Sequence, residues 1–191
     1  MDASPRERLI ETALRLFHRD GFHATGIDRV LAEAGVSKMT LYKHFPSKDL
    51  LILETLRRRD AIFRGWLQAA VESRGPDPRS QLEALFEVLA EWVEGPDFHG
   101  CLFINATAEY GADDDPIHRA AAAHKAMLRH WLTALAAKAG AADPEALAAE
   151  LLILKEGLIV TAQVSGQGSG PSGAAATAQR LAMRAIAAAL D

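Results

Sequence analysis

Residues 24–45 read ATGIDRVLAEAGVSKMTLYKHF, and this stretch decides the fold of the first part of the chain. Gly35 separates two short segments in which apolar residues recur at helical spacing, so the pattern predicts two short helices joined by a tight turn. The apolar side chains expected to hold the two helices together are Val30, Leu31, Val36, Leu41 and Phe45. The polar side chains left on the outer face of the second helix are Ser37, Lys38, Thr40, Lys43 and His44. This is the pattern of a helix-turn-helix.

An exposed polar helix of this kind fits the major groove of duplex DNA, where its side chains can donate to base edges and phosphates. The charge distribution is compatible with that partner. Residues 1–60 contain eleven Lys and Arg against nine Asp and Glu, a balance of +2, whereas residues 61–191 contain ten against sixteen, a balance of −6. The overall charge of −4 is therefore the sum of a basic N-terminal part and an acidic remainder.

The same region resembles the signature of the tetracycline-repressor (TetR) family. The motifs that carry the resemblance are Gly35-Val36-Ser37-Lys38, Thr40-Leu41-Tyr42, His44-Phe45 and Ser47-Lys48-Asp49-Leu50. The resemblance is specific over about residues 5–60 and extends further only as helix number and order. It implies a homodimeric transcriptional repressor that binds a palindromic operator and is released by a small-molecule effector.

The resemblance also implies which residues contact DNA. The helix Lys38–His44 corresponds to the recognition helix, and its candidates for contacts near the bases are Lys38, Met39, Thr40, Lys43 and His44. Positions that grip phosphate are matched by Thr25, Tyr42 and Lys48. A physical reason supports each of these. We expect Thr25 at a helix N-terminus, where free N–H groups favour an anion, and a phosphate would offset the unfavourable position of Lys48 in a first helical turn. Tyr42 offers a hydroxyl on a rigid side chain.

Helical signals follow one another along the rest of the chain. Ser4-Pro5 begins the first helix and Pro46-Ser47 precedes a long fourth helix that extends to Gly75-Pro76. A fifth helix is expected to end at Gly95-Pro96, a sixth to span about 101–110, and a seventh to begin at Pro116. The eighth is expected to run from Asp143-Pro144 to about Ser165. A Gly- and Ser-rich loop, Gly166 to Gly173, then precedes the ninth, Ala174 to Leu190. We therefore predict an all-α fold of about nine helices, with no competing strand pattern.

Two domains are expected: a helix-turn-helix domain over residues 1–47, and a ligand-binding and dimerisation domain over 48–191, with the fourth helix linking them. A single cysteine excludes an intrachain disulfide, and no apolar run has the ~20 residues of a membrane span. No signal peptide is evident, so we expect a cytoplasmic protein that does not enter membranes.

Dimerisation is expected through the eighth and ninth helices. The eighth carries Leu151, Leu154, Leu158 and Ile159, and the Ala-rich ninth carries Ala175, Ala178, Ala182, Ala185 and Ala189 with Leu181, Met183 and Ile186. Small residues allow close approach, so a four-helix bundle across a two-fold axis is plausible. The alternative is that the Ala-rich face packs inside one subunit.

An effector pocket is expected where polar residues interrupt apolar helix faces. The candidate residues are Phe63, Trp66, Phe86, Phe103, Asn105, Glu109, His124, Met127, Trp131 and Glu156. Each of them could instead be a core residue with an ordinary packing role. No cofactor is expected, and no catalytic or metal site: no nucleophile stands beside a base, and the histidines lack metal-ligand spacing. The alternatives are a DNA-binding activator, a ligand-blind regulator and, more remotely, an all-helical dimeric enzyme.

Overall fold

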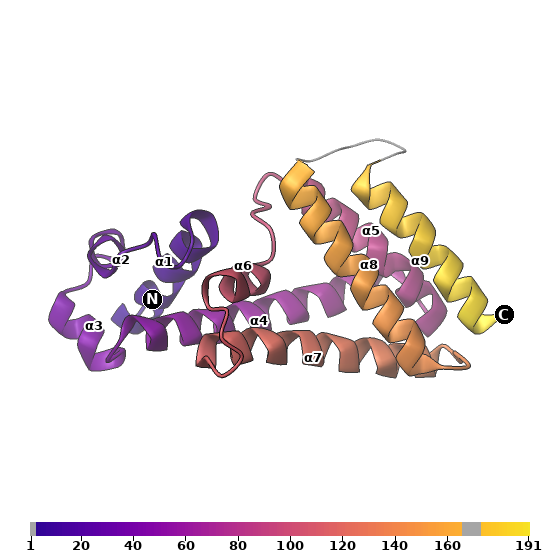
Figure 1. Cartoon of the computed structure of the whole chain (residues 1–191), viewed down its shortest axis with the longest axis horizontal. Helices are drawn as coiled ribbons and strands as arrows, with labels where there is room; N and C mark the ends of the chain where they lie inside the picture. The colour runs from indigo at the N-terminus through magenta and orange to yellow at the C-terminus, as the bar shows by residue number, and fades with distance from the viewer. Residues whose placement is uncertain (1–2, 166–172) are drawn as a thin grey trace. The chain divides into compact units, whose positions relative to one another are not determined.

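The computed structural model describes residues 3–165 and 173–191. Within these ranges the chain forms nine α-helices, which confirms the predicted all-α class (Figure 1). Their bounds are α1 Pro5–Asp20, α2 Ile27–Ala34, α3 Lys38–His44, α4 Lys48–Arg74, α5 Pro78–Glu94, α6 Leu102–Glu109, α7 Pro116–Lys138, α8 Pro144–Ser165 and α9 Ala174–Leu190. None of these helices is both long enough and apolar enough to cross a membrane.

Side-chain caps fix where the helices begin. The Ser4 hydroxyl accepts a hydrogen bond from the N–H of Glu7 at the start of α1, and the carboxylate of Asp77 accepts from the N–H of Ser80 at the start of α5. Each bond satisfies one of the N–H groups that a helix leaves without a partner in its first turn. Of the predicted loop Gly166 to Gly173, residues 166–172 lie outside the described residues.

The helices divide into two compact units. Unit 1 comprises Met1–Ile62 and Leu102–His124, and unit 2 comprises Phe63–Cys101 and Lys125–Asp191. This division by contacts does not fall at residue 47, because the first half of α4, all of α6 and the start of α7 pack with α1–α3. A functional boundary at residue 47 stays a prediction.

Each unit has its own apolar core. In unit 1, α1, α2 and α3 pack around Leu9, Leu16, Phe17, Val30 and Leu41, which are fully buried. In unit 2, α5 packs against both α8 and α9, and the side-by-side pair α8 and α9 is visible in Figure 1. Burial of such side chains, at roughly 25 cal/mol per Å² of apolar surface, is the main stabilising term in each unit.

Candidate nucleic-acid interface

The turn between α2 and α3 depends on Gly35. Its φ of 62° lies in the left-handed region, which glycine adopts without the steric cost that a Cβ brings. Ser37 then caps α3, because its hydroxyl accepts a hydrogen bond from the N–H of Thr40 at 3.2 Å. Leu41 is fully buried and Phe45 nearly so, which orients the seven-residue helix α3 with one face against the core.

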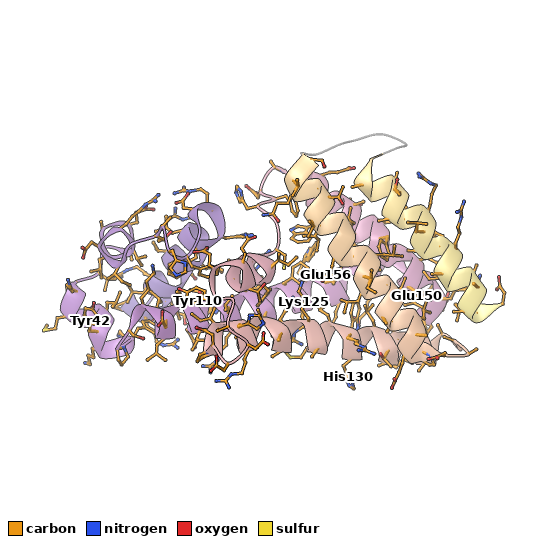
Figure 2. All side chains as sticks on the ribbon, in the orientation of Figure 1. Tyr42, Tyr110, Lys125, His130, Glu150 and Glu156 are labelled. Carbon is orange, nitrogen blue, oxygen red and sulfur yellow. The ribbon has the colours of Figure 1, made fainter. Side chains whose placement is uncertain are left out.

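The opposite face of α3 is exposed to solvent. Met39 is 82% exposed and Tyr42, labelled in Figure 2, is 44% exposed; Lys38, Lys43 and His44 are exposed as well. Lys38 approaches the carboxylate of Asp28 at 3.9 Å, but both side chains are largely exposed, so this ion pair contributes little. Five of the eight predicted DNA-contacting side chains therefore stand on one exposed, cationic surface.

Two of the predicted phosphate-contacting residues, Thr25 and Lys48, are less exposed than the five residues of α3. Thr25 has no exposed surface, and its hydroxyl donates to the carbonyl of Gly21 at 2.7 Å. The N-cap of α2 is Gly26 and not Thr25, so the expected placement of Thr25 at the helix start is corrected. Lys48 does lie at the start of α4; it is half-buried, with its Nζ 6.0 Å from the ring centre of Phe17, and burial lowers the pKa of its ammonium group.

Thr40 occupies an intermediate position. Its side chain is half-buried and shares a 2.8 Å hydrogen bond with the Ser37 hydroxyl. Its hydroxyl thus helps to fix the start of α3.

Arg8 was not identified from the sequence as part of this surface. Its guanidinium group donates to the carbonyl of Ala34 at 3.2 Å and to that of Gly35 at 3.4 Å. These carbonyls stand at the end of α2, where a helix leaves acceptors without partners, so Arg8 holds the α2–α3 turn against α1. Arg8 and Ala34 are 26 residues apart, so no local pattern in the sequence indicates this contact.

Comparison with known proteins agrees with this geometry. Residues 9–55 match the family described as bacterial regulatory proteins, tetR family, and residues 78–178 match the tetracyclin repressor-like C-terminal domain. The solved structure of a TetR-family transcriptional regulator from Streptomyces coelicolor is 33% identical, with a TM-score of 0.88, and the match covers 98% of this chain and 96% of that one.

This chain belongs to the TetR family. It is a helix-turn-helix, DNA-binding transcriptional regulator, and the family is not one of enzymes.

Two curated relatives match this chain over part of their length. The transcriptional activator FasR of Mycolicibacterium smegmatis is 38% identical over 90 residues, which are 47% of this chain and 40% of that protein. The transcriptional regulator YerO of Bacillus subtilis is 48% identical over 48 residues, 25% of this chain and 17% of that protein. These alignments thus span less than half the length of either relative.

The predicted effector residues of this TetR-family chain are divided between the two units. Phe103, Asn105, Glu109 and His124 belong to unit 1, whereas Phe63, Trp66, Phe86, Met127, Trp131 and Glu156 belong to unit 2. Phe86 is 1% exposed and belongs to the core of unit 2, while Met127 is 39% exposed. Asn105 and Trp131 are half-buried.

Glu109 contacts the DNA-binding region itself. One carboxylate oxygen accepts from the N–H of Phe22 at 2.8 Å, and the other accepts from the N–H of His23 at 2.6 Å and lies 2.8 Å from the Nδ1 of His23. Burial alone would raise the pKa of this carboxyl group, but the hydrogen bonds from His23 and Phe22 outweigh burial and lower it. Glu109 therefore anchors the α1–α2 connection to the end of α6.

His124 is the centre of a buried contact in unit 1. It is 1% exposed, its Nδ1 lies 2.7 Å from a carboxylate oxygen of Asp60, and its ring stacks on Phe103 with centres 3.7 Å apart. Asp60 and Phe103, the two residues that contact His124, belong to the same unit as His124. The geometry fits a packing role for His124 as well as it fits a ligand contact.

An aromatic cluster and an ion cluster meet in unit 2. The ring centre of Phe63 lies 5.6 Å from that of Trp66 and 5.1 Å from that of Trp92. Lys155 Nζ lies 5.7 Å from the centre of Phe63, and Lys155 binds Glu156, the predicted pocket residue beside it. The sequence offered a signal for Lys155: it stands four residues from both Leu151 and Ile159, on the apolar stripe of α8.

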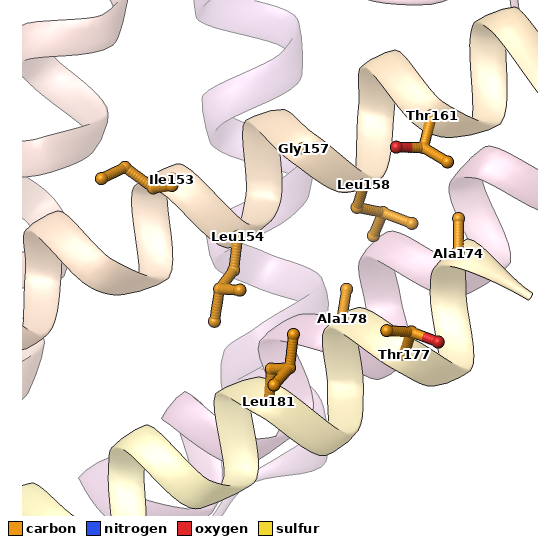
Figure 3. Close-up of a pocket in the computed structure, with 9 residues that line it drawn as sticks. All are labelled: Ile153, Leu154, Gly157, Leu158, Thr161, Ala174, Thr177, Ala178 and Leu181. Carbon is orange, nitrogen blue, oxygen red and sulfur yellow. The ribbon is translucent and has the colours of Figure 1, made fainter. Parts of the chain in front are cut away.

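A groove of about 430 Å³ lies between α8 and α9 (Figure 3). It is lined by Ile153, Leu154, Gly157, Leu158, Thr161, Ala174, Thr177, Ala178 and Leu181. Apolar side chains are exposed on and beside it, with Ile153 at 71% and Val164 at 80%. Of the residues that the sequence predicts at a dimer interface, Leu151, Ile159 and Ala182 are buried within the subunit, whereas Leu154 and Leu181 line the groove. Ala175, Ala178 and Ala182 of α9 thus pack inside the chain, and the predicted residues Leu181 and Met183 of the same helix are exposed.

Proposed function

We propose that this regulator binds a palindromic operator as a homodimer, represses transcription there, and is released by a small-molecule effector. The observation that carries the proposal is the exposed face of α3. Leu41 holds this helix to the core, and its exposed side chains are Lys38, Met39, Tyr42, Lys43 and His44. Side chains of these types can donate to base edges and phosphates in the major groove.

Homodimerisation is supported by the exposed apolar surface of α8 and α9. Ile153, Val160 and Val164 recur along one face of α8, and Leu181 of α9 is 43% exposed. A contiguous apolar face on a soluble protein marks an interaction site, and two copies meeting across a two-fold axis would cover it with the same face of the partner. Such a dimer would carry two α3 helices to half-sites about 34–36 Å apart.

Release by an effector is a linkage between two sites. In one conformation the two α3 helices of the dimer are not spaced to fit successive half-sites. An effector that binds this conformation more tightly than the DNA-binding one lowers the affinity for DNA by the ratio of its two affinities, typically about 5–150-fold. The residues that we assign to the effector site are those of the unit 2 clusters, Phe63, Trp66 and Glu156, since they combine aromatic surface with buried charge.

Activation of transcription is the second candidate. It is favoured by one observation, the 38% identity over 90 residues to a relative named as a transcriptional activator. The shared segment does not decide between the two outcomes, because the direction of regulation depends on where the operator lies relative to the promoter.

The test combines footprinting with transcription in vitro. DNA upstream of the adjacent gene is incubated with the purified protein, and protection and transcript yield are measured on the same fragment. Repression predicts a symmetric footprint and a transcript that falls as protein is added. A footprint accompanied by a rising transcript would establish the activator, and the absence of any footprint on a selected high-affinity site would contradict both.

A further inference from the structure

The cluster of charges in unit 2 is not balanced. Glu156 accepts a hydrogen bond from Lys155 Nζ at 2.8 Å through one carboxylate oxygen, and from Lys125 Nζ at 2.5 Å through the other. Lys125 and Glu156 are labelled in Figure 2. Two ammonium groups therefore share one carboxylate, and in the part of the chain that the structure describes neither of them forms an ion pair with a second acid.

Burial makes this imbalance unfavourable. Lys155 is 1% exposed, so its ammonium group has almost no water to solvate it. Burial and then repulsion from Lys125 lower the pKa of Lys155, while the two lysines outweigh burial and hold the pKa of Glu156 below its ordinary value. A buried charge is stable when it is paired, and here the pairing is one carboxylate short.

Apolar and accessible surfaces adjoin the charges. Lys155 Nζ stands over the ring of Phe63, which is 5% exposed, and that ring contacts Trp92 and Trp66; Trp66 is 39% exposed and forms the accessible end of the aromatic cluster. The side chains of Lys125 and Glu156 are each 25% exposed, so the cluster is not closed to solvent. Lys125 Nζ also lies 3.5 Å from the sulfur of Cys101, which is a weak acceptor.

We propose that Lys125, Lys155 and the adjoining aromatic cluster bind an organic monoanion, a carboxylate carried on a flat apolar body. The carboxylate enters beside the partly exposed Lys125 and supplies the missing negative charge to the two ammonium groups, and the apolar body packs on Trp66, the accessible end of the aromatic cluster. The inference rests on the proposed function to the extent that this anion is the effector, and it names the chemical class of that effector.

The test uses matched acid and amide probes of the same shape: benzoate with benzamide, and 2-naphthoate with 2-naphthamide. Calorimetric titration of the full chain measures the affinity for each. We expect at least one acid to bind about tenfold or more tightly than its amide. This is the difference in affinity that a hydrogen bond to a charged group contributes. Lys155→Met should reduce that ratio to near unity, as should Lys125→Met.

Lys138→Met is the matched control, because it removes a positive charge from an exposed position of α7 in the same unit. It should leave the preference for the acid unchanged. Lys155→Met should also unfold at the same temperature as the unmodified protein or a higher one, since it leaves Lys125 and Glu156 paired one to one. If Lys155→Met does not fold, Lys125→Met, which alters a partly exposed side chain, decides the question.

Two results would overturn the inference: no acid binds more tightly than its amide, or the preference survives both lysine substitutions. DNA retardation in the same samples separates this failure from failure of the proposed function. Lysine-dependent acid binding that leaves the DNA complex intact would support the anion site and contradict effector release. Release of DNA by the amides as readily as by the acids would support effector release and contradict the anion site.

Discussion

The carboxylate of Glu109, at the last residue of α6, accepts a hydrogen bond from the backbone N–H of His23, which lies 86 residues earlier between α1 and α2. The neighbouring N–H of Phe22 donates to the same carboxylate, and the ring of His23 stacks on Tyr110 with centres 4.8 Å apart. The connection between the first two helices of the DNA-binding region is therefore fixed by α6. A displacement of α6 would act directly on that region.

Glu109→Gln should reduce the stability of unit 1. An amide oxygen cannot replace both carboxylate acceptors, so one N–H loses its partner at a cost of about 1–3 kcal/mol. Because the folded-state pKa of Glu109 is lowered, its ionised form stabilises the fold above the ordinary pKa of about 4.3, and this stabilisation is lost as the pH falls through the folded value.

Urea unfolding at pH 7 and at pH 4 and below measures this effect. The difference in unfolding free energy between the unmodified protein and Glu109→Gln should shrink as the pH falls. Glu150→Gln, at an exposed position of α8, is the control and should match the unmodified protein throughout. A difference that is constant with pH would contradict the role assigned to the Glu109 carboxylate.

Lys43→Ala should weaken DNA binding without affecting stability. Lys43 is exposed, and within the described residues its side chain forms no hydrogen bond or ion pair that its removal would break. Loss of one contact to a base or phosphate costs about 1–3 kcal/mol per half-site. Fluorescence anisotropy with a labelled operator gives the affinity, and Lys138→Ala serves as the charge-matched control. Equal affinities for the two variants would remove Lys43 from the interface.

Ile153→Glu should convert the proposed dimer into monomers, because it buries a charge without a partner in the proposed α8–α9 interface. Sedimentation equilibrium measures the mass. Met39→Glu provides the control: it removes another exposed apolar side chain, on α3, and should leave the protein dimeric while abolishing DNA binding. Dimers that persist in Ile153→Glu would place the interface elsewhere.

His124→Leu should lower the stability of unit 1 by about 1–3 kcal/mol, since it removes the 2.7 Å contact with Asp60 from a buried position. Thermal unfolding followed by circular dichroism gives the change. An increase in stability, together with loss of the response to an effector, would instead assign His124 to a binding site.

The sequence predicted α3 and its exposed face because both are local properties. The alternation of Leu41 and Phe45 with Lys38, Lys43 and His44 states which side of the helix faces the core, and Gly35 marks the turn. The helix bounds were likewise predictable from caps such as Ser4 and Ser37.

Long-range partners could not be predicted in this way. Glu109 interrupts an apolar helix and was therefore expected in a pocket, but its partners, Phe22 and His23, are backbone groups 87 and 86 residues away. The small residues of α9 indicate close packing but not which helix they pack against, so the sequence leaves open a partner subunit or the same chain; Ala178 and Ala182 are buried where α5 and α8 contact α9 in the same chain.

Selection of binding sites from a pool of random duplex DNA, with the purified protein as bait, most directly tests whether α3 reads DNA as one of a symmetric pair. We expect an enriched inverted repeat whose half-sites are centred about 10 base pairs apart, or a multiple of that. Met39→Glu should enrich nothing. An enriched sequence without two-fold symmetry, or the same sequence recovered by Met39→Glu, would contradict the assignment of α3.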